Sequence, residues 1–94
     1  TAWLADGFTR LPSLRGQGRT ALTRSEAARL REDLRSRGLK VTAPRVAVLH
    51  GLRTSDVPVS HGEMADRFED AGWDRATVYR NLLDLVKAGL ARRI

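Results

Sequence analysis

Cysteine is absent from the 94-residue sequence, and only two histidines are present. The lack of cysteine excludes disulfide bridges and thiolate metal sites, and it suits a reducing cell interior. With two histidines and no cysteine, the sequence suggests no catalytic Ser–His–acid triad and no Cys–His pair. The phosphate-binding pattern G-x-x-x-x-G-K-[ST] is missing as well. We therefore expect that the protein is not an enzyme and has no catalytic residues.

The sequence also lacks an apolar run of about 18 residues, which a membrane-spanning helix needs. Its first residues show no basic stretch followed by an apolar one, so no secretory signal peptide is evident. Hydrophobic residues make up 41% and charged residues 30%, which is typical of a folded globular chain. These features predict a cytoplasmic domain with no membrane partner and no small-molecule substrate.

Basic residues are in excess: 17 Lys and Arg against 11 Asp and Glu give a formal net charge of +6. Most of them are arginines, whose planar fork suits bidentate contacts to phosphate and guanine. A basic domain of this size is suited to DNA, RNA, an anionic membrane or an acidic protein. Net charge alone does not choose among these partners.

The composition changes near residue 24. Residues 1–24 hold four arginines, one aspartate and three glycines, which predicts a basic, mostly irregular N-terminal arm. This arm is either a disordered leader or an extension that docks on a partner, and the residues leave both readings open. Residues 25–94 carry periodic apolar residues and are predicted to form the folded domain.

Periodicity and capping residues predict four helices in the folded domain, over about 25–37, 43–53, 60–72 and 74–88. Ser25, Thr42, Ser60 and Asp74 are the expected N-caps. Short extended segments at 57–59 and 90–94 are expected to pair as a two-stranded β element. A helix-turn-helix followed by a strand is typical of a winged helix. The expected fold class is therefore mainly α: a winged helix-turn-helix over 25–94, with the chain ending inside the wing.

The helix at 74–88 is the candidate DNA reader. Its apolar side predicts an opposite, solvent-facing side centred on Arg80, with Thr77 nearby and Tyr79 at the flank. A recognition helix places such residues of its first turns in the major groove. Arginine can fork onto guanine or bind phosphate, and tyrosine can contact phosphate or a thymine methyl group. Arg75 and Thr77 lie near the helix N-terminus, which favours phosphate. The competing interpretation is an ordinary solvated helix face.

Two motifs at matching separation resemble the DNA-binding half of the ferric uptake regulator (Fur) family. They are G-L-K-V-T-A-P-R at 38–45 and A-T-V-Y-R-N-L at 76–82, followed by A-G-L at 88–90. The resemblance covers roughly residues 27–94 and implies a bacterial transcriptional regulator, typically a dimeric, metal-sensing repressor. It implies that Tyr79 and Arg80 contact bases and phosphate, that Lys40 reaches the adjacent minor groove, and that Arg45 holds the backbone beside it. An A·T-rich operator is then the expected partner.

The sequence departs from that family in three ways. It stops at Ile94, without the C-terminal domain through which the family dimerises and binds zinc or iron(II). Pro58 stands where the family often has a metal-binding histidine, and the N-terminal arm is longer than usual. His50 and His61 do not make a zinc site, which needs three or four ligands. We therefore expect no metal site and no cofactor in this chain.

Two hypotheses of different classes remain at this point. The first is sequence-specific binding of double-stranded DNA as a Fur-like transcriptional regulator, with the helix at 74–88 in the major groove. The alternative is a protein-interaction or dimerisation module built on a winged helix. In that case the exposed edge of 90–94, or the apolar residues of the N-terminal arm, would pair with a second copy as a homodimer.

Overall fold

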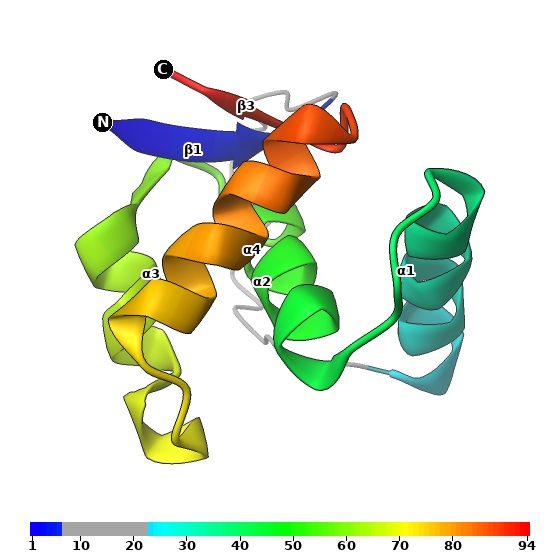
Figure 1. The fold of residues 1–94 in the computed structure, drawn as a ribbon, viewed down its shortest axis with the longest axis horizontal. Helices are drawn as coiled ribbons and strands as arrows, with labels where there is room; N and C mark the ends of the chain where they lie inside the picture. The colour runs from blue at the N-terminus through cyan, green and yellow to red at the C-terminus, as the bar shows by residue number, and fades with distance from the viewer. Residues whose placement is uncertain (7–22) are drawn as a thin grey trace.

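The computed structural model describes residues 1–6 and 23–94, and within them the fold is mainly helical, with four α-helices and a three-stranded sheet (Figure 1). No helix in these two stretches is long and apolar enough to cross a membrane. Residues 7–22 of the expected arm lie outside the described residues. The elements in chain order are β1 (Ala2–Ala5), α1 (Arg24–Ser36), α2 (Ala43–Arg53), β2 (Val59–Ser60), α3 (His61–Arg67), the 3₁₀ helix η2 (Glu69–Ala71), α4 (Arg75–Lys87) and β3 (Ala91–Arg93).

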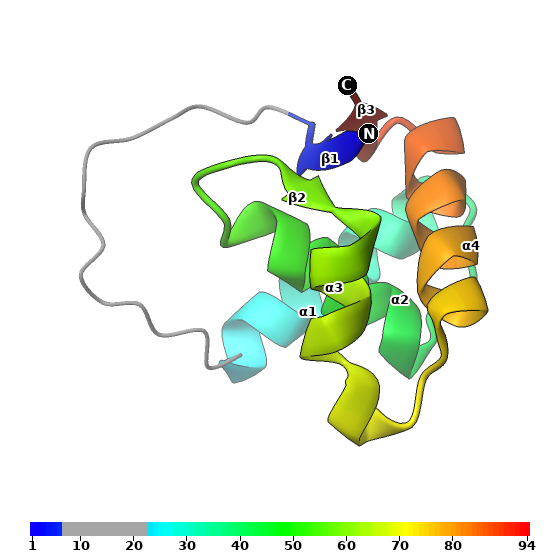
Figure 2. The same cartoon turned by 90° about the vertical axis from the view of Figure 1, so that its left-hand side faces the viewer.

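The sheet has the antiparallel order β2-β1-β3, and Figure 2 shows its strands together at one end of the helical layer. The expected direct pairing of 57–59 with 90–94 is therefore wrong, because β1 lies between the two segments. Trp3 is opposite Val59 on one side and opposite Arg93 on the other. The expected irregular arm thus begins with the central strand of the sheet.

The reason for this placement is the apolarity of β1. Trp3, Leu4 and Ala5 are 2%, 6% and 4% exposed, so both faces of the strand are covered. A strand buried on both faces reads as a continuous apolar run rather than as an alternating one. β2 begins only at Val59, and Pro58 precedes it at a sheet edge, where its missing N–H does no harm.

The core lies where α2 packs against α1, α4 and β1. Gly51 of α2 lets α3 approach closely, since a Cβ atom there would lie 3.1 Å from the sulfur of Met64. Val48 is fully buried in the core, and Val46 on the same helix is half-buried. The largest fully buried side chains are Trp3, Leu34, Leu49, Leu52, Met64, Leu82, Leu85, Val48 and Val78.

The helix starts follow side-chain capping. α1 begins one residue earlier than expected, because Thr23 rather than Ser25 is its N-cap. The Thr23 hydroxyl accepts the Glu26 N–H at 3.1 Å, and the Glu26 carboxylate accepts the Thr23 N–H at 3.1 Å. This reciprocal capping box needs Glu or Gln three residues after the cap, which Ser25 lacks. Ser60 is the N-cap of α3, as expected, and it forms the same reciprocal capping box with Glu63.

Two helices, α1 and α4, end in the same glycine motif, at Gly38 and Gly89. Gly89 has φ +81, and the next N–H, of Leu90, donates back to the Leu85 carbonyl at 2.9 Å. This bond satisfies a carbonyl that the helix end would leave unpaired. The Ala88 carbonyl at the same helix end is also satisfied, because the Arg37 guanidinium donates to it at 2.6 Å. This bond links the end of α1 to the end of α4.

Replacing Trp3 by alanine tests whether β1 is part of the core. We expect a loss of about 3–5 kcal/mol in the free energy of unfolding, because a large buried aromatic side chain leaves a cavity. Urea denaturation followed by circular dichroism measures the loss. Ile94→Ala is the control, since Ile94 is 67% exposed. Equal stabilities for the two variants would mean that β1 is not in the core.

Candidate nucleic-acid interface

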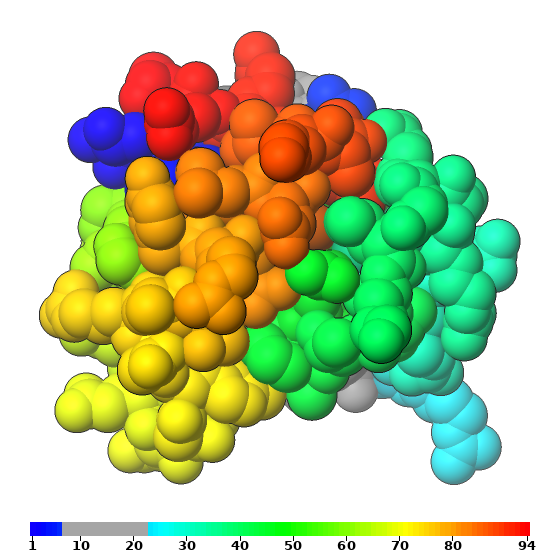
Figure 3. All heavy atoms as spheres, in the orientation of Figure 1, coloured from blue at the N-terminus to red at the C-terminus, as the bar shows by residue number. Residues whose placement is uncertain are grey.

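The outward face of α4 is the first part of the candidate interface. Val78, Leu82 and Leu85 on its inner side are almost fully buried. The residues opposite them therefore face solvent. Figure 3 shows α4 in orange across the middle of this face, with the green segment that leads into α2 beside it and red β3 above. The exposed residues on the outward side of α4 are Ala76, Tyr79, Arg80 and Lys87.

Tyr79 belongs to an aromatic cluster with Trp3 and His61. Its side chain is 38% exposed, and its ring centroid lies 6.0 Å from that of Trp3 and 5.1 Å from that of His61. The His61 ring is also held through its Nε2 atom, 3.0 Å from the Arg75 carbonyl oxygen. A carbonyl oxygen only accepts, so Nε2 carries the hydrogen. The rings of Trp3 on β1 and His61 on α3 thus restrain Tyr79, while part of its side chain remains in solvent.

The other expected contact residues of α4 differ in their availability. Arg80 is exposed and has no hydrogen-bond or ion-pair partner within residues 1–6 and 23–94. Arg75 lies 3.5 Å from Asp66, and both side chains are mostly exposed. Exposed ion pairs contribute little, so Arg75 can exchange Asp66 for another anion. Thr77 is half-buried.

Asp74 places a negative charge at the start of α4. Its carboxylate accepts the backbone N–H of Thr77 at 2.8 Å. Hydrogen bonds from Thr77, with a smaller contribution from the positive charge of Arg80, hold the pKa of Asp74 below its ordinary value of 3.8. The carboxylate is therefore ionised at neutral pH, so the end of the helix is less favourable for phosphate than its dipole alone would make it.

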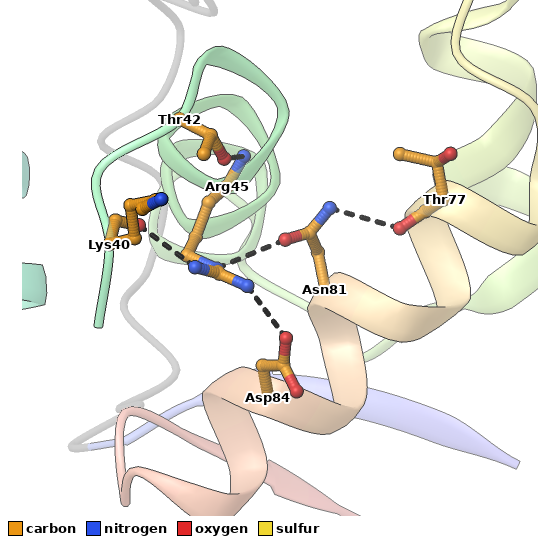
Figure 4. A network of polar contacts seen from close by, with 6 residues as sticks. All are labelled: Lys40, Thr42, Arg45, Thr77, Asn81 and Asp84. Carbon is orange, nitrogen blue, oxygen red and sulfur yellow. Dashed lines mark hydrogen bonds and ion pairs between the residues drawn. The ribbon is translucent and has the colours of Figure 1, made fainter. Parts of the chain in front are cut away.

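Arg45 is occupied by partners within the chain, as Figure 4 shows. Its guanidinium donates to the side-chain oxygen of Asn81 at 3.1 Å, to the backbone carbonyl of Lys40 at 2.8 Å and to the carboxylate of Asp84 at 2.6 Å. The side chain is 15% exposed. Arg45 is thus held between α2, α4 and the segment before α2, whereas the sequence interpretation placed it on the DNA backbone.

Lys40 lies on the segment before α2 and is exposed. Its backbone carbonyl is held by Arg45, and within the described ranges its amino group has no ion-pair partner. Arg45 therefore holds the backbone of Lys40 close to α4, while the ammonium group of Lys40 remains available to bind an anion.

Sequence reasoning gave no binding or positioning role to Trp3, His61, Asn81 or Asp84. Asn81 carries a signal that can be recognised in the sequence: it lies three residues after Val78, on the inward side of α4, where a polar residue needs partners. It is 7% exposed, and its amide donates to the Thr77 carbonyl at 2.9 Å. The contacts of Trp3 and Asp84 come from segments far away in the sequence and leave no local pattern.

A metal centre does not fit the residues that the structure describes. No group of three or more His, Cys, Asp or Glu side chains in these residues is arranged to hold a metal ion. Nε2 of His61 is already engaged with a backbone carbonyl. The described residues therefore offer no set of ligands for the zinc or iron(II) of the resembled family.

No protein-family model matches this sequence, and comparisons with curated proteins and with solved structures found no match either. The resemblance to the Fur family therefore rests on the two motifs themselves.

The capping carboxylates predict a loss of stability in acid. Hydrogen bonds to the capping partners lower the pKa of Glu26, Glu63 and Asp74 in the folded protein. Their stabilisation is present above the unfolded pKa values and disappears as the pH falls through the folded ones. We expect the Tm to fall below about pH 4.5, because protonation then favours the unfolded chain.

Thermal melts between about pH 3 and 7 test this linkage. Asp74→Asn is the matched variant, because asparagine still caps a helix but does not titrate. Its Tm should depend less on pH in the acid range. A wild-type Tm that is constant down to pH 3 would contradict the assignment.

Proposed function

We propose that this protein is a winged helix-turn-helix domain that binds double-stranded DNA and inserts α4 into the major groove. The arrangement of the elements supports this proposal. α3 and α4 are joined through η2 and a turn at Gly72, which has φ +84, and α4 is followed by β3 of the sheet. This order is that of a helix-turn-helix with a wing.

The observation that carries the proposal is the unpaired Arg80 beside the restrained ring of Tyr79. Both lie on the solvent-facing side of α4, together with the small side chain of Ala76 one turn earlier. A helix about 10–12 Å across fits a major groove about 12 Å wide. Ala76 permits a close approach of the helix, while Arg80 supplies a fork for guanine or phosphate.

The charged residues next to α4 extend this surface. Lys40 lies beside the helix, Lys87 lies in its last turn, and Arg92 and Arg93 are exposed on β3. These cations are suited to the phosphates that flank a groove. The acidic Asp84 does not oppose them strongly, because Arg45 binds it at 2.6 Å.

The Fur-like motifs support transcriptional regulation as the use of this DNA binding. Tyr79, Arg80 and Lys40 occupy the motif positions for which the resemblance implies contacts in both grooves. A lysine that enters a narrow minor groove favours A·T-rich sequence through shape. We therefore assign an A·T-rich operator as the preferred partner.

Fluorescence anisotropy across a salt series tests the proposal. We expect the protein to bind an A·T-rich duplex more tightly than a G·C-rich duplex or a single strand. Neutralisation of about 4–6 phosphates should give a slope of about −4 to −5 for log affinity against log salt. Equal binding of duplex and single strand, or a slope near zero, would contradict it.

Arg80→Ala tests the docking of α4. We expect duplex affinity to fall by about 1–3 kcal/mol, because the variant loses a forked contact to a base or phosphate. Arg29→Ala is the matched control, since Arg29 is an exposed arginine on α1, outside the proposed surface. Both variants should keep the wild-type Tm. An unchanged affinity for Arg80→Ala would exclude this docking geometry.

A protein-interaction module is the second candidate, and β3 is the observation that favours it. β3 pairs with β1 on one side and, within the described part of the chain, with no strand on the other. An open edge can pair with a strand of a second chain. A defined dimer in sedimentation experiments, together with no salt-sensitive DNA binding, would favour this candidate over the first.

A further inference from the structure

Arg45 connects two parts of the proposed DNA surface that are far apart in the sequence. Its Nη1 atom donates to the Lys40 carbonyl, and its Nε and Nη2 atoms contact Asn81 and Asp84 of α4 (Figure 4). Asn81 in turn donates to the Thr77 carbonyl. One guanidinium thus joins the Lys40 peptide to the middle of the reader helix.

The three contacts use the shape of the guanidinium and not only its charge. Arginine presents five N–H donors in a rigid fork, which can satisfy several acceptors at once, whereas lysine has a compact ammonium group. The orientation of the Asn81 amide is fixed from both sides, because its oxygen accepts from Arg45 and its nitrogen donates to Thr77. The link is therefore specific to arginine at position 45.

The same contacts make Arg45 a poor phosphate ligand. The side chain is 15% exposed, and Asp84 already balances its charge at 2.6 Å. Three of its five N–H donors are already used by these partners, and the adjacent Asp84 carboxylate would repel a phosphate. The ammonium group of Lys40, in contrast, lies on an exposed residue whose backbone Arg45 holds.

We propose that Arg45 is a positioning residue that fixes Lys40 relative to Arg80, so that both reach the DNA without further ordering of the segment before α2. This inference rests on the proposed DNA binding. Fixing a segment before binding raises affinity, because the complex does not lose that conformational freedom. Lys40 then contributes to binding only while Arg45 holds its backbone.

Arg45→Lys is the variant that separates positioning from charge. It keeps the positive charge but loses the fork. We expect it to bind the A·T-rich duplex about three- to tenfold more weakly, because the segment of Lys40 is no longer ordered. The slope of its log affinity against log salt should become less steep by about 1, as if one phosphate contact had been removed. A direct phosphate contact by residue 45 would instead leave the salt slope unchanged.

A double-mutant cycle with Lys40→Ala measures the coupling. We expect Lys40→Ala to weaken binding in the wild type and to have little further effect in Arg45→Lys. Arg80→Ala should keep its full effect in both backgrounds. Additive effects of Lys40→Ala and Arg45→Lys would overturn the positioning role.

Arg53→Lys is the matched control, because Arg53 lies on the same helix and forms a similar ion pair, with Asp33 of α1 at 2.6 Å. We expect it to leave the salt slope and the effect of Lys40→Ala as in the wild type. Coupling of Lys40 to Arg53 as well would indicate general loosening of the fold and would overturn the specific role of Arg45. All titrations are made well below the Tm of the least stable variant.

An NMR measurement without DNA distinguishes failure of this inference from failure of the proposed function. Backbone ¹⁵N order parameters of residues 39–41 should fall from about 0.85, the value of rigid backbone, in Arg45→Lys but not in Arg53→Lys. Unchanged order parameters in Arg45→Lys would overturn the positioning role. A fall in these values in a protein whose wild type binds no duplex would support the structural link and overturn the DNA-binding function.

Discussion

Burial of β1 in the middle of the sheet is the constraint on which the rest of the structure depends. β2 and β3 are short and do not contact each other as neighbours; each is held by pairing with this strand. Trp3 of β1 is 2% exposed and is part of the core. Its ring also packs edge-on against the ring of Tyr79 on α4. Its indole N–H has no hydrogen-bond partner among the described residues, so packing rather than polar contact holds it in place. The position of the proposed reader surface therefore depends on a segment from the far end of the chain.

Arginines that bind partners within the chain impose a second set of constraints on how the helices are arranged. Arg37 binds the end of α4, Arg45 joins α4 to the Lys40 segment, and Arg53 joins α2 to α1. Each uses its charge inside the fold, so the net charge of +6 is a poor measure of what remains for nucleic acid. What matters is which cations are left exposed and unpaired, and Arg80 and Lys40 meet that condition on neighbouring elements.

Both constraints bear on the proposed function in the same physical way. An exposed side chain binds more tightly when the backbone below it is already ordered, because less conformational freedom is lost in the complex. The aromatic cluster orders Tyr79, and the contacts of Arg45 order the backbone of Lys40. The surface proposed to bind DNA thus consists of exposed side chains on backbone that other residues of the fold hold in place.

The sequence did not predict that the helix expected over about 60–72 divides into α3 and η2. It did predict four helices and the exposed side of α4, because capping and apolar periodicity act within a few residues. It also placed Arg80 on that exposed side. The tertiary structure alone places residues 2–5 in the central strand, since a four-residue apolar run has no periodicity that would identify a strand. It likewise decided that Arg45 turns inward, because its partners Asn81 and Asp84 lie 36 and 39 residues away. Contacts over such distances depend on how the helices pack, and no local pattern encodes them.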